Sequence, residues 1–404
     1  MKTLMQISLL STAAILTACG GGGGSSGGGG AGTGTGGGDP VARNCQISDS
    51  ADVNWDALEN DNLEKLSDYN LFTSSCDPTR DAHGGIAYDL NTPLFSDYTS
   101  KYRFVFVPDG QSATYNEDTV FDFPVGTVIT KTFALPADTA YRGYDPQTST
   151  ETLLETRLLI HRAGGWTALP YVWNADGTEA TYRVQGAQLP ATLVHNGAQE
   201  SFTYSVPDKA QCKQCHSHDT GDTNVFIPIG PKARHLNGDM DYGSGPENQL
   251  SHWSDAGILS GLPALDQVDK VPSYHDADAG LISGYSDEQL MAAAKGYLDV
   301  NCAHCHGVGG TAAYTGLQLE FWRDYDTEKE KHGVCKGPIA YDQGEMTYDV
   351  VPGNADESIL HFRMDTTNPQ DSMPRLGRAL IHEEGVALVK AWINSLPDAS
   401  CSSK

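Results

Sequence analysis

Basic residues are scarce in this chain of 404 residues, where 26 Lys and Arg stand against 52 Asp and Glu and give a net charge of -26. Phosphate backbones require a basic surface, so this balance argues against nucleic-acid binding. The acidity permits docking to a basic partner protein, although solubility alone also accounts for it. No solenoid-type repeat is present, and beyond Leu16 no apolar run approaches the length of a membrane helix.

The first residues are typical of an export signal. A positive start at Lys2 precedes an apolar run from Leu4 to Leu16, which is too short for a permanent membrane helix. The run ends in Leu16-Thr-Ala-Cys19, which resembles a bacterial lipobox. We therefore expect residues 1–18 to be a lipoprotein signal peptide and Cys19 to carry a lipid anchor in the bacterial cell envelope. Gly20 stands where an Asp would favour the inner membrane, so the outer membrane is expected, facing the periplasm or the exterior. The alternative is an ordinary signal peptide that happens to contain a cysteine.

Two regions of different composition follow. Residues 19–44 are rich in Gly, Ser and Thr and are expected to form a flexible linker. Residues 45–205 are expected to be a β-rich domain, because alternating runs such as 101–107 and 126–133 are bounded by turn signals. Strands at this spacing predict a β-sandwich-like domain or a small barrel. No catalytic motif occurs in it.

The remaining chain contains one short motif twice. Cys212-Lys-Gln-Cys215-His216 and Cys302-Ala-His-Cys305-His306 are both C-x-x-C-H, the attachment pattern of c-type haem. Two thiols add to the two vinyl groups on one porphyrin edge, and the next His is held beneath the iron. With nine Cys and 13 His in the chain, chance produces only about 0.006 such matches. We therefore expect two covalent haem c groups, with His216 and His306 as proximal iron ligands.

These cysteines have three other possible interpretations. A zinc ribbon would use Cys212, Cys215, Cys302 and Cys305, but the motifs lie far apart and export removes the reducing compartment that favours such sites. A thioredoxin-like pair is a second possibility, yet two such pairs each followed by His are unusual. Disulfides within each motif would be strained. The repeated motif therefore favours haem.

The second motif lies between two predicted helices. Ser286 to Gln289 forms a capping box, which predicts a helix from Asp287 that delivers Cys302 at its end. A second amphipathic helix is predicted to stop at Pro397. Met373-Pro374 lies between the two helices, where a class I cytochrome c places its sixth ligand. Residues 283–404 are therefore expected to be a class I cytochrome c-like domain with Met373 as an iron ligand. An ordinary loop or core Met is the alternative.

The sixth ligand of the first haem stays open. Residues 206–282, the first haem segment, offer His218, His235, Met240 and His252, and none of them has a diagnostic context. An open sixth position is also possible. An open iron can bind small ligands or peroxide, whereas a closed one favours electron transfer.

The other cysteines are even in number and can therefore all pair in disulfides. Apart from Cys19 and the four haem cysteines, the chain contains Cys45, Cys76, Cys335 and Cys401. In an oxidising compartment the simplest pairing is Cys45–Cys76 and Cys335–Cys401. The other two connectivities and free thiols are the alternatives.

Several stretches resemble an uncharacterised family of bacterial dihaem c-type cytochrome lipoproteins with an N-terminal β module. They include 88–97, 123–127 and 155–159 in the β region, and 229–232, 248–250, 301–306 and 349–353 in the haem region. The resemblance covers nearly all of residues 45–397. It implies haem binding and electron transfer in the envelope, and related modules occur attached to quinoprotein-like dehydrogenase domains. No dehydrogenase domain is present here, so such catalysis would come from a partner.

Together these observations predict an α+β multidomain protein, in which an N-terminal β-sandwich-like domain precedes mainly α cytochrome c-like haem domains. We expect an electron carrier, more than a catalyst on its own, that passes electrons to an envelope redox protein. The alternatives are a peroxidase-like haem enzyme with an open first haem and a redox subunit docked to an envelope dehydrogenase.

Overall fold

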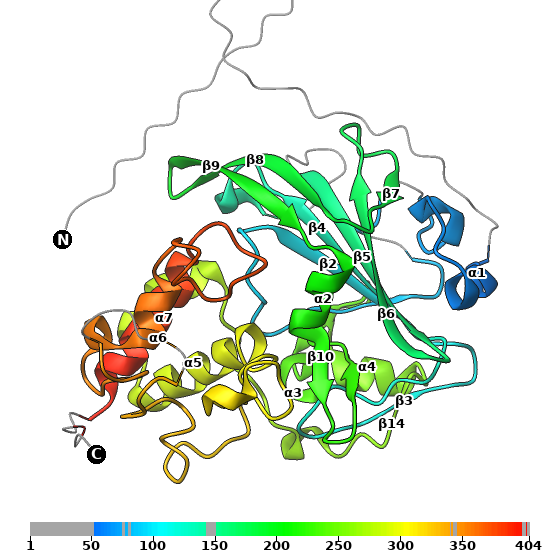
Figure 1. Ribbon diagram of the computed structural model, residues 1–404. Coiled ribbons are helices and arrows are strands. Elements are labelled where there is room, and N and C mark those ends of the chain that lie inside the picture. Colours follow the sequence, from blue (N-terminus) through cyan, green and yellow to red (C-terminus); the bar gives the residue numbers. More distant parts are fainter. Residues whose placement is uncertain are drawn as a thin grey trace, which may run out of the picture. The chain divides into compact units, whose positions relative to one another are not determined.

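A computed structural model describes residues 52–74, 77–79, 82–142, 151–339, 341, 346–397 and 401 (Figure 1). All of them belong to one compact unit. The unit contains both strands and helices, and its largest sheet is antiparallel, so the α+β class is confirmed. The predicted signal peptide, the lipid-anchor position Cys19 and the linker lie outside the described residues.

The strands are β1 (Ile86–Ala87), β2 (Ser100–Phe106), β3 (Ala113–Thr114), β4 (Val128–Leu135), β5 (Thr152–Arg162), β6 (Gly165–Trp173), β7 (Ala180–Tyr182), β8 (Ala187–His195), β9 (Ala198–Val206), β10 (Ser217–Asp219), β11 (Asn224–Phe226), β12 (Asp239–Asp241), β13 (Pro246–Asn248) and β14 (Leu259–Ser260). The α-helices are α1 (Trp55–Asn60), α2 (Lys209–His216), α3 (Ala233–Leu236), α4 (Gln249–Asp255), α5 (Asp287–Asn301), α6 (Ile359–Met364) and α7 (Glu383–Ser395). The 3-10 helices are η1 (Leu66–Tyr69), η2 (Thr139–Tyr141), η3 (Leu265–Gln267), η4 (Asp276–Gly284), η5 (Ala313–Thr315) and η6 (Ala355–Glu357).

One six-stranded antiparallel sheet, in the order β1-β2-β4-β5-β6-β7, organises the β region. Because side chains alternate along a strand, every second residue points to the same face. One face is apolar and packs against α1 and η1. The buried side chains of this layer include Leu58, Leu66, Tyr69, Phe104, Phe106, Leu158, Ile160 and Tyr171.

The opposite face of the sheet is shared between a hairpin and a cavity. The β8–β9 hairpin packs against one end of the face, where Leu193 and Tyr204 lie in the same apolar cluster as Phe133 and Val172. Within the described part of the chain, the second layer of the predicted β-sandwich-like domain is therefore a two-stranded hairpin, since β8 and β9 form their own sheet and the six-stranded sheet has β7 as its last strand.

The predicted helices that flank the second motif are confirmed. The α5 helix begins at Asp287 after a capping box between Ser286 and Gln289, and it ends just before Cys302. The α7 helix ends at Ser395, short of Pro397. The two helices pack together around Tyr297 and Trp392, both of which are buried.

The segment between the sheet and α5 is less helical than predicted. Residues 206–282 form helices of at most nine residues and strands of two or three residues. Frequent Gly and Pro residues interrupt any longer helix. The segment also shares its core with the sheet, since Leu250 and Trp253 pack in one cluster with Val105 and Ile129.

Candidate functional site

The first motif occupies one short helix. Asp208 caps α2 by accepting a hydrogen bond from the Gln211 amide. The Gln211 side chain in turn accepts one from the Asp208 amide, which completes a capping box. Residues three and four apart lie on the same face of a helix. The helix therefore presents Cys212, Cys215 and His216 together, with the Cys212 side chain buried and the other two half-buried.

The His216 imidazole is oriented by a main-chain carbonyl. Its Nδ1 lies 2.7 Å from the oxygen of Ile227, and its ring stacks on Phe226 with 4.8 Å between ring centroids. Burial lowers the pKa of His216 to about 3, so the ring is neutral. A neutral ring that donates from Nδ1 keeps the Nε2 lone pair available for a metal.

The second motif follows α5 in a tight turn. The amides of Cys305 and His306 both donate to the Cys302 carbonyl, over 3.1 and 2.8 Å. The Thr315 hydroxyl donates to the carbonyl of Ala312, so its oxygen accepts from His306 Nδ1, which lies 3.3 Å away. Burial lowers the pKa of His306. Its Nε2 is therefore also free to act as a ligand.

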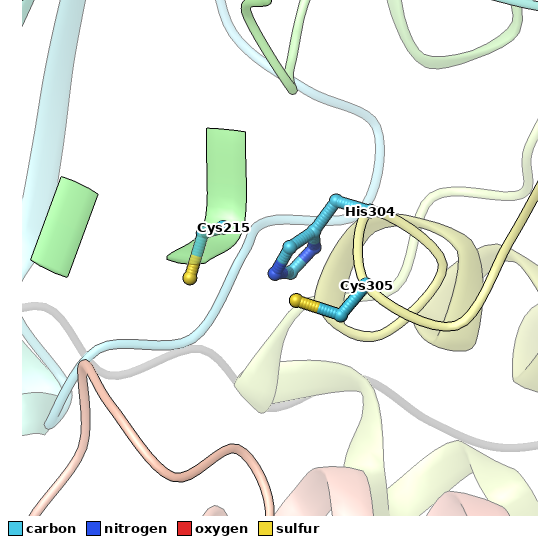
Figure 2. Close-up of side chains that lie close together, drawn as sticks. All are labelled: Cys215, His304 and Cys305. Atoms are coloured by element: carbon cyan, nitrogen blue, oxygen red, sulfur yellow. The ribbon is translucent and has the colours of Figure 1, made fainter. Parts of the chain in front are cut away.

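The two motifs touch each other although they lie far apart in the sequence. The Thr311 hydroxyl donates to the Gln214 carbonyl over 2.9 Å, and the Cys305 sulfur lies 3.5 Å from the same oxygen. Figure 2 shows the side chains of Cys215, His304 and Cys305 turned toward one another, and their ligand atoms lie within 4.8 Å. A hydrogen bond from Cys215 lowers the pKa of the Cys305 thiol. The thiolate is the reactive and metal-binding form of cysteine.

A cavity that is open to solvent adjoins both motifs, and most of its lining is apolar. A concave, mostly apolar lining with a few polar groups is the usual form of a small-molecule or cofactor site. On one side the cavity is bounded by the six-stranded sheet, at the part of its face that the β8–β9 hairpin does not cover. The predicted site residues that line it are Cys212, Cys215, His216, Cys302 and Met373. Cys305 and His306 lie on the turn beyond Cys302 and do not line it.

Met373 is held in the loop between α6 and α7. Its amide donates to the Arg363 carbonyl over 2.8 Å, and its own carbonyl accepts from Arg378 Nε over 3.1 Å. The side chain is half-buried and lines the cavity together with Met364. These contacts restrain the loop and leave the thioether at the cavity, which Cys302 of the second motif also lines.

None of the four side chains predicted as a possible sixth ligand of the first haem lines this cavity. His235 is fully buried, and its Nε2 lies 2.6 Å from the Asp299 carboxylate. His252 stacks on Tyr242 and contacts Glu247. His218 and Met240 lie on the short strands β10 and β12.

Three cationic residues that also line the cavity were not predicted from the sequence: Arg103, Lys131 and Arg157. They lie on β2, β4 and β5, and Lys131 is the one charged residue of β4. That isolated charge was a usable signal, because a charge in a buried strand needs a partner.

The remaining predicted cysteines are divided between two regions. Cys335 and Cys401 are joined by a disulfide bond in the structure, across a separation of 66 residues. The predicted partner pair, Cys45 and Cys76, lies outside the described residues. The four motif cysteines have no disulfide partner among the described residues.

Comparisons with protein-family models, with curated proteins and with solved structures found no match. Within the part of the chain that the structure describes, no helix is long and apolar enough to cross a membrane.

Proposed function

We propose that this chain is a dihaem c-type cytochrome that transfers electrons in the bacterial cell envelope. Haem would be attached at Cys212 and Cys215 and again at Cys302 and Cys305. Bound haem iron supplies reversible one-electron chemistry. The observation that carries the proposal is the direct contact of the two C-x-x-C-H motifs beside one cavity.

The donor atoms fit this cofactor. His216 and His306 each use Nδ1 in a hydrogen bond within the chain, so Nε2 is the nitrogen left to bind a metal. This arrangement is the usual one for histidines that bind a metal. Met373 adds a soft thioether at the cavity, and thioether ligation raises a reduction potential relative to two histidines.

The chain's own residues position both groups and hold them close. The hydrogen bond from Thr311 to Gln214 and the one from the Asp219 amide to the Gly309 carbonyl, 2.7 Å long, fasten the two motif regions together. The apolar core of α5 and α7 excludes water behind the second motif. The proposal further includes a lipid anchor on Cys19 and an envelope redox protein as partner.

A haem enzyme with an open first haem is the second candidate. It is favoured by one observation: none of the four side chains His218, His235, Met240 and His252 lines the cavity. An open iron would bind small ligands such as peroxide.

A redox-titrated absorption spectrum of the purified full chain, with and without CO, separates these functions. Two haems per chain without CO binding support the electron carrier. CO binding to one of the two haems supports the haem enzyme. No pyridine haemochrome signal, with zinc bound at Cys215, His304 and Cys305 instead, would overturn both proposals. The double variant Cys212→Ser/Cys215→Ser is the matched control and should lose one haem only.

A further inference from the structure

Three cations stand side by side on the cavity face of the sheet. Arg103 on β2 is directly opposite Lys131 on β4, and Lys131 is directly opposite Arg157 on β5. All three line the cavity with the first motif. Like charges on facing strands destabilise a sheet. The arrangement therefore requires negative charge on the same face.

Two of the cations have partners within the chain. Arg157 donates two hydrogen bonds to Glu155, over 2.8 and 2.6 Å, and Glu155 also accepts one from the Tyr204 hydroxyl. Arg103 pairs with Asp89, whose side chain is 55% exposed. The second terminal nitrogen of Arg103, Nη2, is buried and has no hydrogen-bond partner in the described structure. Water therefore weakens the one ion pair that Arg103 makes with the described residues.

Lys131 is the least compensated of the three. Its ammonium makes no hydrogen bond or ion pair with the described residues, and it lies 5.0 Å from the ring centre of Phe133. The Arg157 guanidinium lies over the same ring, 4.4 Å from its centre. Burial, followed by the positive charges of Arg103, Lys101 and Arg157, lowers the pKa of Lys131 well below its usual range. A bound anion would remove most of this penalty, because an uncompensated buried charge is costly.

The row lies beside the first motif. Arg157 on β5 is directly opposite Pro170 on β6, and the α2 helix, which carries Cys212 and His216, contacts β6. The anion that reaches the row should therefore be part of the group held by Cys212 and His216.

We propose that Arg103, Lys131 and Arg157 form the binding site for the propionate carboxylates of the haem attached at Cys212 and Cys215. This inference rests on the proposed function. Haem carries two carboxylates on the porphyrin edge opposite its vinyl groups, and the vinyl groups are the ones that the cysteines hold. Guanidinium groups bind carboxylates in a forked geometry, and an ammonium adds a mobile point charge. The β region would thus form one wall of the first haem site.

The test compares four forms of the full-length haem-loaded protein: the natural chain, Lys131→Met, Lys131→Arg and Lys101→Met. Lys101 is the matched control, because it lies on the neighbouring strand β2 but outside this cavity and donates to the Thr99 carbonyl. Each form is analysed for covalent haem content, for its two midpoint potentials, and by resonance Raman spectroscopy of the propionate bending band.

Lys131→Met should keep both haems, shift the propionate band and lower one midpoint potential, because a cation beside the carboxylate favours the reduced form. Lys131→Arg should restore the natural values, and Lys101→Met should leave the propionate band unchanged.

An unchanged band and unchanged potentials in Lys131→Met, with both haems attached, would overturn the propionate site but leave the proposed function intact. Absence of covalent haem from the natural chain would overturn the proposed function itself. If Lys131→Met does not accumulate, Lys131→Gln takes its place in the same measurements.

Discussion

Thr311 donates a hydrogen bond to the carbonyl of Gln214 over 2.9 Å, although the two residues are 97 positions apart. Gln214 lies inside the first C-x-x-C-H motif, and Thr311 lies in the loop after the second. This contact brings the two motifs together, and in the proposed function it would hold the two haems close enough for electrons to pass between them.

Replacing Thr311 with Val should weaken that contact. Loss of one hydrogen bond between protein groups costs about 0.5–1.5 kcal/mol of unfolding free energy, and this exposed bond belongs near the lower limit. Denaturant unfolding of the haem-loaded protein measures the change. Thr311→Ser keeps the hydroxyl and is the control. Equal stability of the Val and Ser variants would show that the hydrogen bond contributes nothing.

Asp299 should control acid stability. Burial raises its pKa, but Lys232, Arg234 and a hydrogen bond from His235 outweigh burial and hold the pKa of Asp299 well below its usual range. A depressed pKa means that this stabilisation is complete above the unfolded-state value of about 3.9 and is lost as the pH falls below it.

Asp299→Asn should therefore cost about 3–5 kcal/mol at pH 7, because it leaves buried cations unpaired. Its stability should also depend less on pH between about pH 4 and pH 2 than that of the natural chain. Urea unfolding across this range is the measurement. The exposed Asp324 provides the control, since Asp324→Asn should leave stability nearly unchanged. Parallel pH profiles for the natural chain and Asp299→Asn would contradict the prediction.

Gly385 should resist substitution even by Ala. Ala usually stabilises a helix by about 1 kcal/mol relative to Gly. At this position of α7, however, an added Cβ would lie 2.4 Å from the Tyr297 hydroxyl oxygen and 2.7 Å from His382 Nδ1. We expect Gly385→Ala to destabilise the protein by about 1–3 kcal/mol through this overlap. Gly164, where a Cβ would meet nothing within 4 Å, is the control. A higher melting temperature for Gly385→Ala would refute the close packing of α5 and α7 here.

Met373 should set the potential of the second haem. Met373→Ala is expected to lower one midpoint potential and to alter the absorption spectrum, because thioether ligation raises the potential of haem iron. Met240→Ala is the control, since Met240 does not line the cavity. A spectrum and potential unchanged by Met373→Ala would remove Met373 from the set of ligands.

Local features of the fold could be predicted from the sequence, while contacts between distant segments could not. The capping box at Ser286 and Gln289 predicted the start of α5, because it depends on four neighbouring residues. The meeting of Thr311 with Gln214 depends on the folded path of 97 residues. The row of Arg103, Lys131 and Arg157 depends on strand register, which burial and tertiary contacts determine together.

The candidate site shows the same division. The residues of the two C-x-x-C-H motifs could be identified because the two cysteines and the histidine that attach a haem lie within five consecutive positions. The sixth ligand of the first haem could not, since a distal ligand has no sequence spacing relative to the motif. The first haem segment was also predicted as a separate helical unit, whereas Trp253 packs into a core shared with the sheet.

The central claim is that one chain carries two covalent haems. Intact mass spectrometry of the purified protein, produced together with a cytochrome c maturation system, tests it directly. The account predicts a mass increase of two haems for the natural chain, and of one haem for both Cys212→Ser/Cys215→Ser and Cys302→Ser/Cys305→Ser. A natural chain with no covalent haem, or with one haem that survives either double substitution, would contradict it.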